Sequence, residues 1–394
     1  MVIIMNKKNV LVLFIYSFLN SFLLYRACDV LYYLSKGISN SEYINYLTIG
    51  SLITIIFLIP FGLIKDKYNR KYILLASNLF LLLATVLYIC ADNVLVMGIG
   101  IIMSAISNLL SQGIVISLLH SYIDDKKEYT KMYYKWSIFY YSGYLISMIL
   151  GGVVAKFSLV SMYYISIIPI MMNFLVLLFF NDSYEKTKEK NSSKLLLKES
   201  YKLLKNSRLL KIILLSEIVI IPLADILAES HPEYLSNIGA STTLIGIYTA
   251  IMCLFAIVGN KIATIYKNQN NKFFVFALLF NFSLILIGLL NNYFSIIFII
   301  LFQCFFSVTN NIYNTIVQNE CNDSYKQTVL AIFTFITSIS EMIICTITSM
   351  IFKNISLGHS YIVLGIFGLA IMLIIVIFNI FKNKNAQELQ ELSK

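Results

Sequence analysis

Charged residues are scarce in this sequence of 394 residues, and their scarcity excludes an ordinary soluble domain. Asp, Glu, Lys and Arg make up 13% of the chain, whereas hydrophobic residues make up 59% and the mean hydropathy is +0.80. A typical soluble domain has about 25% charged residues. The composition therefore predicts a polytopic membrane protein.

Common signatures of nucleotide, metal and redox chemistry are also absent from the sequence. It has no Gly-x4-Gly-Lys-Ser/Thr phosphate loop, no His-Glu-x-x-His and no Cys-x-x-Cys. Neither ATP-driven pumping nor a common metal site is indicated, and we expect no enzymatic activity, no cofactor and no bound metal. The six cysteines are scattered through or beside apolar runs, so we interpret them as packing residues rather than a disulfide framework.

The basic residues follow a topological pattern. The formal net charge is +10, which could suggest a nucleic-acid partner. However, 26 of the 30 Lys and Arg residues lie on one predicted side of the membrane, three lie on the other side, and Arg26 lies inside a predicted helix. Cytoplasmic loops carry such an excess of bases. The pattern places both termini in the cytoplasm and argues against nucleic acid as a partner.

The apolar runs predict twelve membrane helices in two groups of six. We expect an N-terminal bundle in 1–181, a partly helical cytoplasmic linker in 182–210, a C-terminal bundle in 211–381 and a cytoplasmic tail in 382–394. The predicted spans are roughly 9–36, 43–64, 72–91, 95–123, 130–155 and 159–180, then 211–236, 242–265, 272–290, 294–318, 327–352 and 358–381.

A short charged block joins the second and third predicted helices. Gly62 lacks a side chain, so the helix that contains it can lie close to a neighbour. Asp66 is suited to lie under the positive N-terminal end of another helix, and Arg70 can hold its carboxylate by two hydrogen bonds. Lys67 and Lys71 add positive charge. These residues predict a latch that forms in one conformation and breaks in another; the alternative is a basic loop that only fixes orientation.

This spacing resembles motif A of the major facilitator superfamily, and the chain resembles that family over nearly its whole length. The resemblance implies an all-α integral membrane fold with twelve transmembrane helices in two pseudo-symmetric six-helix bundles. The family usually has Gly where this chain has Asn69; because Asn tolerates positive φ, we expect the tight turn to survive. Gly259, Ala263 and Lys267 repeat the motif in a weaker form in the second half.

Polar residues in the predicted first, fourth, seventh and tenth helices form stripes at helical spacing. The resemblance implies that these four helices line a central cavity. The cavity-lining candidates are Asn108 and Gln112 in the fourth helix, and Gln303, Asn310 and Asn314 in the tenth.

Five charged residues are candidates for coupling to protons or substrate. Arg26 and Asp29 are three positions apart on one helix face, so they can form a structural ion pair or a coupling pair. Glu217 and Asp225 flank Pro222, which we expect to interrupt the seventh helix; Glu341 lies deep in the eleventh. Carboxylates in such settings can carry a proton near neutral pH. Structural pairing and a position at the membrane interface are the alternatives.

We interpret the sequence as that of a secondary transporter that exports a small amphipathic or cationic compound by alternating access, driven by protons. Gly143, Gly151 and Gly152 form part of the antiporter motif of the family, but Leu109 stands where proton-coupled members often have Arg. The alternatives are a nutrient uptake symporter and a non-transporting receptor. The expected partners are a small-molecule substrate, protons and membrane lipid, and we expect a monomer in a bacterial plasma membrane.

Overall fold

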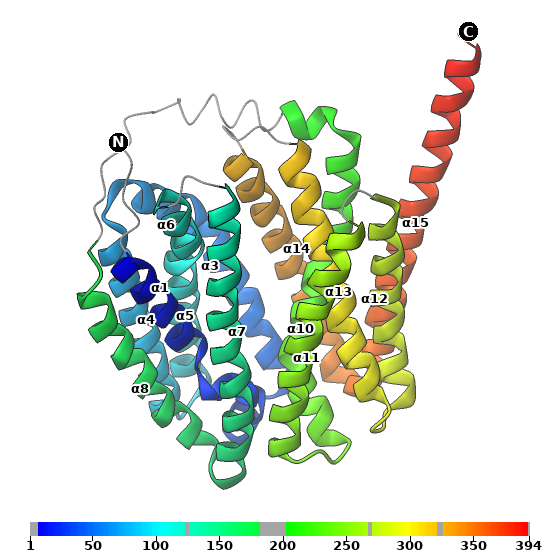
Figure 1. Ribbon diagram of the computed structural model, residues 1–394. Helices are drawn as coiled ribbons and strands as arrows, with labels where there is room; N and C mark the ends of the chain where they lie inside the picture. The colour runs from blue at the N-terminus through cyan, green and yellow to red at the C-terminus, as the bar shows by residue number, and fades with distance from the viewer. Residues whose placement is uncertain (1–6, 123–125, 182–201, 267–269, 321–325, 393–394) are drawn as a thin grey trace. The chain divides into compact units, whose positions relative to one another are not determined.

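The computed structural model describes residues 7–122, 126–181, 202–266, 270–320 and 326–392, and every regular element in them is a helix (Figure 1). The elements of the first half are α1 (Lys7–Ser21), η1 (Leu24–Ala27), α2 (Asp29–Ser35), α3 (Asn40–Lys67), α4 (Arg70–Cys90), α5 (Val94–Ser111), α6 (Ile114–Tyr122), α7 (Lys126–Phe157) and α8 (Leu159–Leu178). The second half contains α10 (Arg208–Asn237), α11 (Thr242–Tyr266), α12 (Asn270–Leu290), α13 (Ser295–Glu320), α14 (Lys326–Asn354) and α15 (Leu357–Leu392).

The chain divides into two compact units. The first contains Met1–Lys188 and Leu235–Ala250, and the second contains Glu189–Tyr234 and Ile251–Lys394. The first turns of α11 thus group with the first unit. Most of the predicted linker lies outside the described residues, and the predicted domain boundaries stay a prediction.

Two of the predicted membrane helices are interrupted, so the prediction of continuous helices was wrong there. The first breaks after Ser21 and resumes as η1 and α2. The fourth divides into α5 and α6 at Gln112 and Gly113, where Gly113 has φ +77°. Only glycine adopts this backbone conformation without steric cost. Both breaks expose backbone groups that a continuous helix would have paired internally.

Ten helical segments among the described residues are long and apolar enough to cross a membrane. The two predicted spans outside this set are the interrupted first segment and α10. The sequence of α10 includes four acids, Glu217, Asp225, Glu229 and Glu233, and ionisable groups lower the apolar character of a span. Each of these two spans is the first predicted membrane helix of its half of the chain.

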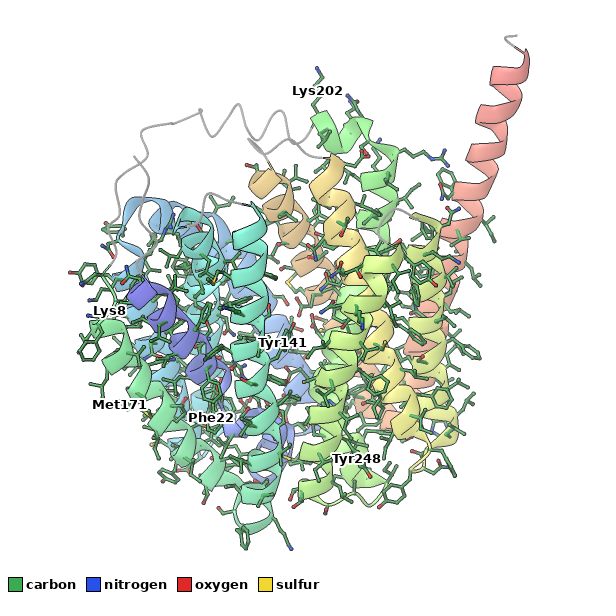
Figure 2. The ribbon with its side chains drawn as sticks, in the orientation of Figure 1. Lys8, Phe22, Tyr141, Met171, Lys202 and Tyr248 are labelled. Carbon is green, nitrogen blue, oxygen red and sulfur yellow. The ribbon has the colours of Figure 1, made fainter. Side chains whose placement is uncertain are left out.

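The helices have apolar side chains on their outer faces. Ile59 is 64% exposed, Phe157 is 83% exposed and Ile374 is 66% exposed. Figure 2 shows Met171 pointing outward from α8, where it is 48% exposed. Polar Asn78, in contrast, is 1% exposed and donates a hydrogen bond from α4 to the carbonyl of Ile170 on α8. Apolar side chains on the outside, and a buried amide that donates a hydrogen bond on the inside, fit a hydrocarbon environment.

Local capping explains where several helices begin. Ser39 and Glu42 form a capping box at the start of α3. Asn69 has φ −61°, and its side-chain oxygen accepts a hydrogen bond of 2.9 Å from the backbone N–H of Lys71. The expectation of a turn with positive φ at Asn69 was therefore wrong. Asn69 instead serves as the N-cap of α4.

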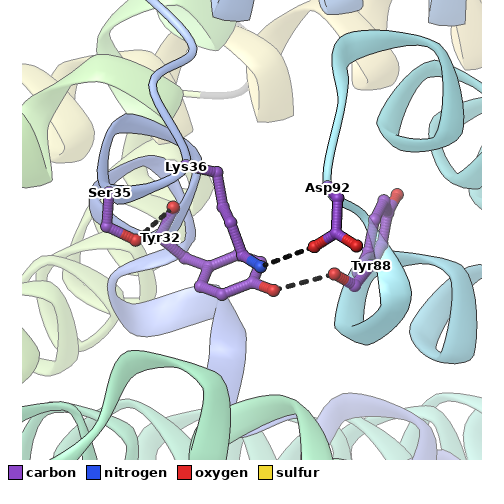
Figure 3. A network of polar contacts seen from close by, with 5 residues as sticks. All are labelled: Tyr32, Ser35, Lys36, Tyr88 and Asp92. Carbon is purple, nitrogen blue, oxygen red and sulfur yellow. Dashed lines mark hydrogen bonds and ion pairs between the residues drawn. The ribbon is translucent and has the colours of Figure 1, made fainter.

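A polar network ties the end of α2 to the turn between α4 and α5 (Figure 3). The Tyr32 hydroxyl donates to the carbonyl of Tyr88 at 2.8 Å, and Ser35 donates to the carbonyl of Tyr32 at 2.7 Å. Lys36 Nζ lies 3.7 Å from Asp92 Oδ1 and 5.7 Å from the centroid of the Tyr32 ring. These contacts fix the short helix α2 within the first unit.

Candidate functional site

One face of α10 packs against α12 and α15 within the second unit. The Tyr234 hydroxyl donates to the carbonyl of Ile287 at 2.7 Å, and Ser230 and Tyr361 share a hydrogen bond of 2.8 Å. Asp225 and Glu229 lie one turn apart on the opposite side of α10, because successive residues of an α-helix are rotated by about 100°. Both acids therefore point away from the packed face.

Helix α14 brings a third carboxylate to this side of α10. Asp225 interacts electrostatically with Glu341 and with Glu229. Cys345, one turn beyond Glu341, interacts with the same three carboxylates. We call Asp225, Glu229 and Glu341 the acidic cluster. The sequence identified Asp225 and Glu341 as separate candidates. Spacing along one helix could not predict that α10 and α14 bring them together.

Glu229 was not among the predicted coupling residues. The available signal was its position four residues after Asp225, which places both on one helix face. Glu341 likewise lies in a polar face of α14 whose residues recur at helical spacing: Thr334, Thr337, Ser338, Cys345 and Thr348. Within the described part of the chain, no group of His, Cys, Asp and Glu side chains is arranged to hold a metal ion.

Glu217 lies apart from the acidic cluster on the same helix. It is 0% exposed, and both carboxylate oxygens lack a hydrogen-bond partner among the described residues. It precedes Asp225 by two turns, or about 12 Å along the axis. Helix α10 continues through Pro222 without interruption, so the predicted break at this proline was wrong.

In the first unit, Arg26 lies in η1, just after the break in the first segment. Its guanidinium is within hydrogen-bonding reach of the Tyr140 hydroxyl and interacts electrostatically with Tyr25 and Tyr144. The Asp29 carboxylate accepts a hydrogen bond of 2.8 Å from the backbone N–H of Val30, at the start of α2. Whether Arg26 and Asp29 act as a coupling pair stays a prediction.

Helix α7 supports the break in the first segment. A Cβ atom added at Gly143 would meet the carbonyl of Phe18, and one added at Gly151 would meet the carbonyl of Leu24. Hydroxyls satisfy nearby polar groups: Ser21 donates to the carbonyl of Tyr140 at 2.7 Å. The backbone N–H of Leu24 donates to Ser166 Oγ at 2.9 Å. Small residues and hydroxyls thus compensate for the lost helical hydrogen bonds.

A second glycine contact joins α7 to the beginning of α11. Gly152 faces Gly246 so closely that a Cβ atom on either residue would collide with the other helix. The three glycines of the partial antiporter motif therefore all lie where backbone approaches backbone.

The motif A region is only partly described. Lys65 Nζ donates to the carbonyl of Gln112 at 3.0 Å, and Lys71 Nζ donates to the carbonyl of Leu178 at 2.8 Å. Among the described residues, a Cβ atom added at Gly62 would meet nothing within 4 Å, so none of them approaches that residue closely in this conformation. The side chains of Asp66 and Lys67 lie outside the described part, and the latch with Arg70 stays a prediction.

The candidate cavity residues occupy two helices. Asn108 and Gln112 are exposed near the end of α5, whereas Gln303, Asn310 and Asn314 are half-buried on α13. Asn314 Nδ2 donates to Asn310 Oδ1 at 3.0 Å, which confirms that these two amides share one face of α13. That these five residues line a cavity stays a prediction.

The family model of the Major Facilitator Superfamily matches residues 10–344 of the chain. No curated protein matches this chain in sequence. Among solved structures, a mutant of the nucleoside transporter NupG is similar with a TM-score of 0.78 at 13% identity, covering 93% of this chain and 98% of that one. A POT family transporter in complex with 5-aminolevulinic acid gives 0.74 at 13% identity, with 94% and 95% covered. A D-xylose-proton symporter gives 0.70 at 14% identity, with 94% and 97% covered.

Proposed function

Since the chain belongs to the major facilitator superfamily, we propose that it is a proton-coupled exporter of a small amphipathic or cationic compound that works by alternating access. Membership makes it a multi-pass membrane transporter of small molecules with twelve transmembrane helices in two pseudo-symmetric bundles. The coupling ion, the substrate and the direction are the proposal.

The acidic cluster supports this proposal most directly. Asp225 and Glu229 from α10 and Glu341 from α14 interact electrostatically in one unit. Three neighbouring carboxylates inside a membrane cannot all be ionised without a large cost, so the cluster is stabilised by a bound proton or a bound cation. A cationic substrate and protons would then compete for the same carboxylates, which is the linkage that an antiporter needs.

Glu217 supports the same proposal from a second position. A fully buried carboxyl group without a described hydrogen-bond partner is much less costly when it is protonated. It lies on the same helix as Asp225 and offers a second place to hold a proton. The glycine contacts of α7 support export more weakly, through the partial antiporter motif.

Proton movement in proteoliposomes with a pH dye inside tests the coupling. We expect a lipophilic cation to drive proton movement in the wild-type protein, and Asp225→Asn and Glu341→Gln to reduce it at least tenfold. Glu320→Gln is the matched control, because Glu320 is exposed and accepts a hydrogen bond from Ser207. Undiminished coupling in both cluster variants would contradict the proposal.

Uptake by proton symport is the second candidate, favoured by the D-xylose-proton symporter among the similar structures. The same liposomes separate the two directions. A cation that moves opposite to protons supports export, whereas a sugar or nucleoside that moves together with protons supports uptake. Ligand binding without any flux would favour the receptor alternative.

The proposed setting is a bacterial plasma membrane, with the chain monomeric and both termini in the cytoplasm. The distribution of 26 of 30 basic residues on one side supports this orientation. The exposed apolar faces of the helices support direct contact with membrane lipid.

A further inference from the structure

The fourth predicted membrane helix is divided into two parts by a short break in the first unit (Figure 1). Helix α5 ends with Gln112 as its C-cap, at φ −54° and ψ 122°, and α6 begins at Ile114. Between them, Gly113 has φ +77°, a conformation that glycine adopts without steric cost. The break is thus confined to the backbone of Gln112 and Gly113.

The helical parts on either side of the break are firmly held. In α5, the hydroxyl of Ser107 donates to the carbonyl of Ser77 in α4 at 2.7 Å, and the hydroxyl of Ser77 donates to the carbonyl of Ser107 at 2.9 Å. In α6, Leu118 and Leu119 are 0% exposed and belong to a core cluster that includes Leu13 of α1. Two anchored segments that meet at a glycine have the arrangement of a hinge.

Lys65 donates to a carbonyl that the break separates from its helical partner. In a continuous helix, the carbonyl of Gln112 would accept the backbone N–H of Ile116. Here it accepts a hydrogen bond of 3.0 Å from Lys65 Nζ, which comes from the charged block at the end of α3. Basic side chains near a helix C-terminus commonly satisfy such carbonyls. The ammonium group of Lys65 thus replaces a hydrogen bond that a straight helix would restore.

We propose that this break is a two-state hinge and that Lys65 holds it in the bent state. In the straight state, the first three backbone N–H groups of α6 would pair with the last three carbonyls of α5, counted through Gln112. In the bent state, these N–H groups begin a new helix and have no intrahelical acceptor, while Lys65 stabilises the bend. The two states exchange one set of hydrogen bonds for another, so a change at Lys65 shifts the balance between them.

The hinge connects the charged block to the helix that carries two of the cavity candidates. Asn108 lies in the last turn of α5, and Gln112 is its C-cap. The direction of the Gln112 side chain depends on the backbone that Lys65 holds, so a movement of the charged block reaches Gln112 through this hydrogen bond. The inference goes beyond the proposed function, since it needs neither proton coupling nor a particular substrate.

Hydrogen exchange of the purified full-length protein, measured by mass spectrometry on peptides that cover 110–118, tests the hinge. The amides of Ile114, Val115 and Ile116 report its state, because intrahelical hydrogen bonds protect them only when the helix continues through the break. Ser117 is the internal reference. Its N–H donates to the carbonyl of Gly113 at 3.0 Å in the bent state and would do so in a straight helix as well.

We expect Lys65→Met, which removes the donor, to slow exchange at these three amides by about threefold or more. Gly113→Ala should slow it as well, because Ala disfavours positive φ and favours helix. A general loss of stability would make the same amides exchange faster, so the direction of the change separates a hinge from a purely structural contact. Unchanged or faster exchange in either variant would overturn the inference; if Lys65→Met does not fold, Gly113→Ala decides.

Two further lysine variants assign the effect to this contact. Lys65→Arg keeps a donor and should exchange like the wild-type protein. Lys71→Met is the matched control, because Lys71 Nζ also donates to a carbonyl at a helix end, that of Leu178 in α8, at 2.8 Å. It should leave exchange at the three amides unchanged. Slower exchange in Lys65→Arg or in Lys71→Met would overturn the role of the Lys65 hydrogen bond.

Discussion

At the scale of single residues, Asn69 stands where the family usually has Gly, and it starts the next helix by capping rather than by a turn with positive φ. Its side chain caps α4 by accepting the backbone N–H of Lys71. We expect Asn69→Ala to destabilise the protein by about 1 kcal/mol, and Asn69→Gly by only a few tenths. Thermal unfolding of the purified variants measures this difference. Asn69→Asp, which retains a capping oxygen, is the control; equal losses for Ala and Asp would contradict the capping role.

Glu217 allows a structural role to be separated from a role in transport. It is buried, and its carboxylate oxygens lack described partners. Replacement by the similarly sized Met should raise the stability by about 1 to 3 kcal/mol, because a buried polar group without a partner is removed. Transport coupled to protons should fall in the same variant.

The control for this experiment is Ser216→Ala, which removes a buried hydroxyl that already donates to the carbonyl of Ile212. It should change the stability by less than about 1.5 kcal/mol and leave transport unaffected. If Glu217→Met destabilises the protein instead, the carboxyl group makes a stabilising interaction that the Met side chain does not replace.

At the scale of helices, the sequence located the membrane segments well and their interruptions poorly. Apolar runs and charged loops define twelve segments, since both signals are local in the chain. The break before η1 depends on Gly143, Gly151 and Ser166, which come from other helices far along the chain. Conversely, Pro222 predicted a break that the structure does not have, because α10 continues through it.

The candidate site was predictable in part for the same reason. The acids of α10 stand out from their own sequence, but their proximity to Glu341 is a property of how α10 and α14 pack. Likewise, the spacing of Arg26 and Asp29 predicts a local pair, which stays a prediction, but it could not show that Tyr140 and Tyr144 of α7 lie near Arg26. Spacing along one helix does not report contacts made by another.

The glycines of α3 and α7 provide a matched pair of element-scale variants. Gly151→Ala would place a methyl group against the carbonyl of Leu24 and should destabilise this conformation by about 1 to 3 kcal/mol. The new methyl group of Gly62→Ala meets no atom of the described residues within 4 Å, and the substitution should stabilise α3 by up to about 1 kcal/mol, because Ala favours helix more than Gly.

Thermal unfolding and transport should be measured on both glycine variants. If Gly62 is needed for a close approach in another conformation, Gly62→Ala will slow transport without lowering the unfolding temperature. A normal transport rate in Gly62→Ala would instead favour the role of the charged loop as a determinant of orientation.

At the scale of the whole molecule, Cys90 tests the orientation in the membrane. It is exposed at the end of α4, on the side opposite to the basic loops. In intact cells, a membrane-impermeant maleimide should label the wild-type protein, and Cys90→Ser should lose that labelling. Labelling of Cys90 only after the membrane is permeabilised would reverse the proposed topology.

The leading segment of each half has a consequence for biosynthesis. The first is broken after Ser21, and α10 carries Glu217, Asp225 and Glu229. An acidic residue near the centre of a nascent helix opposes its insertion by the translocon by about 2.5 to 3.5 kcal/mol. Each half therefore begins with the segment least able to enter the lipid alone, and later helices must retain it. Ribosome-bound chains that end after α10 should leave this helix accessible, while chains that extend through α14 should not.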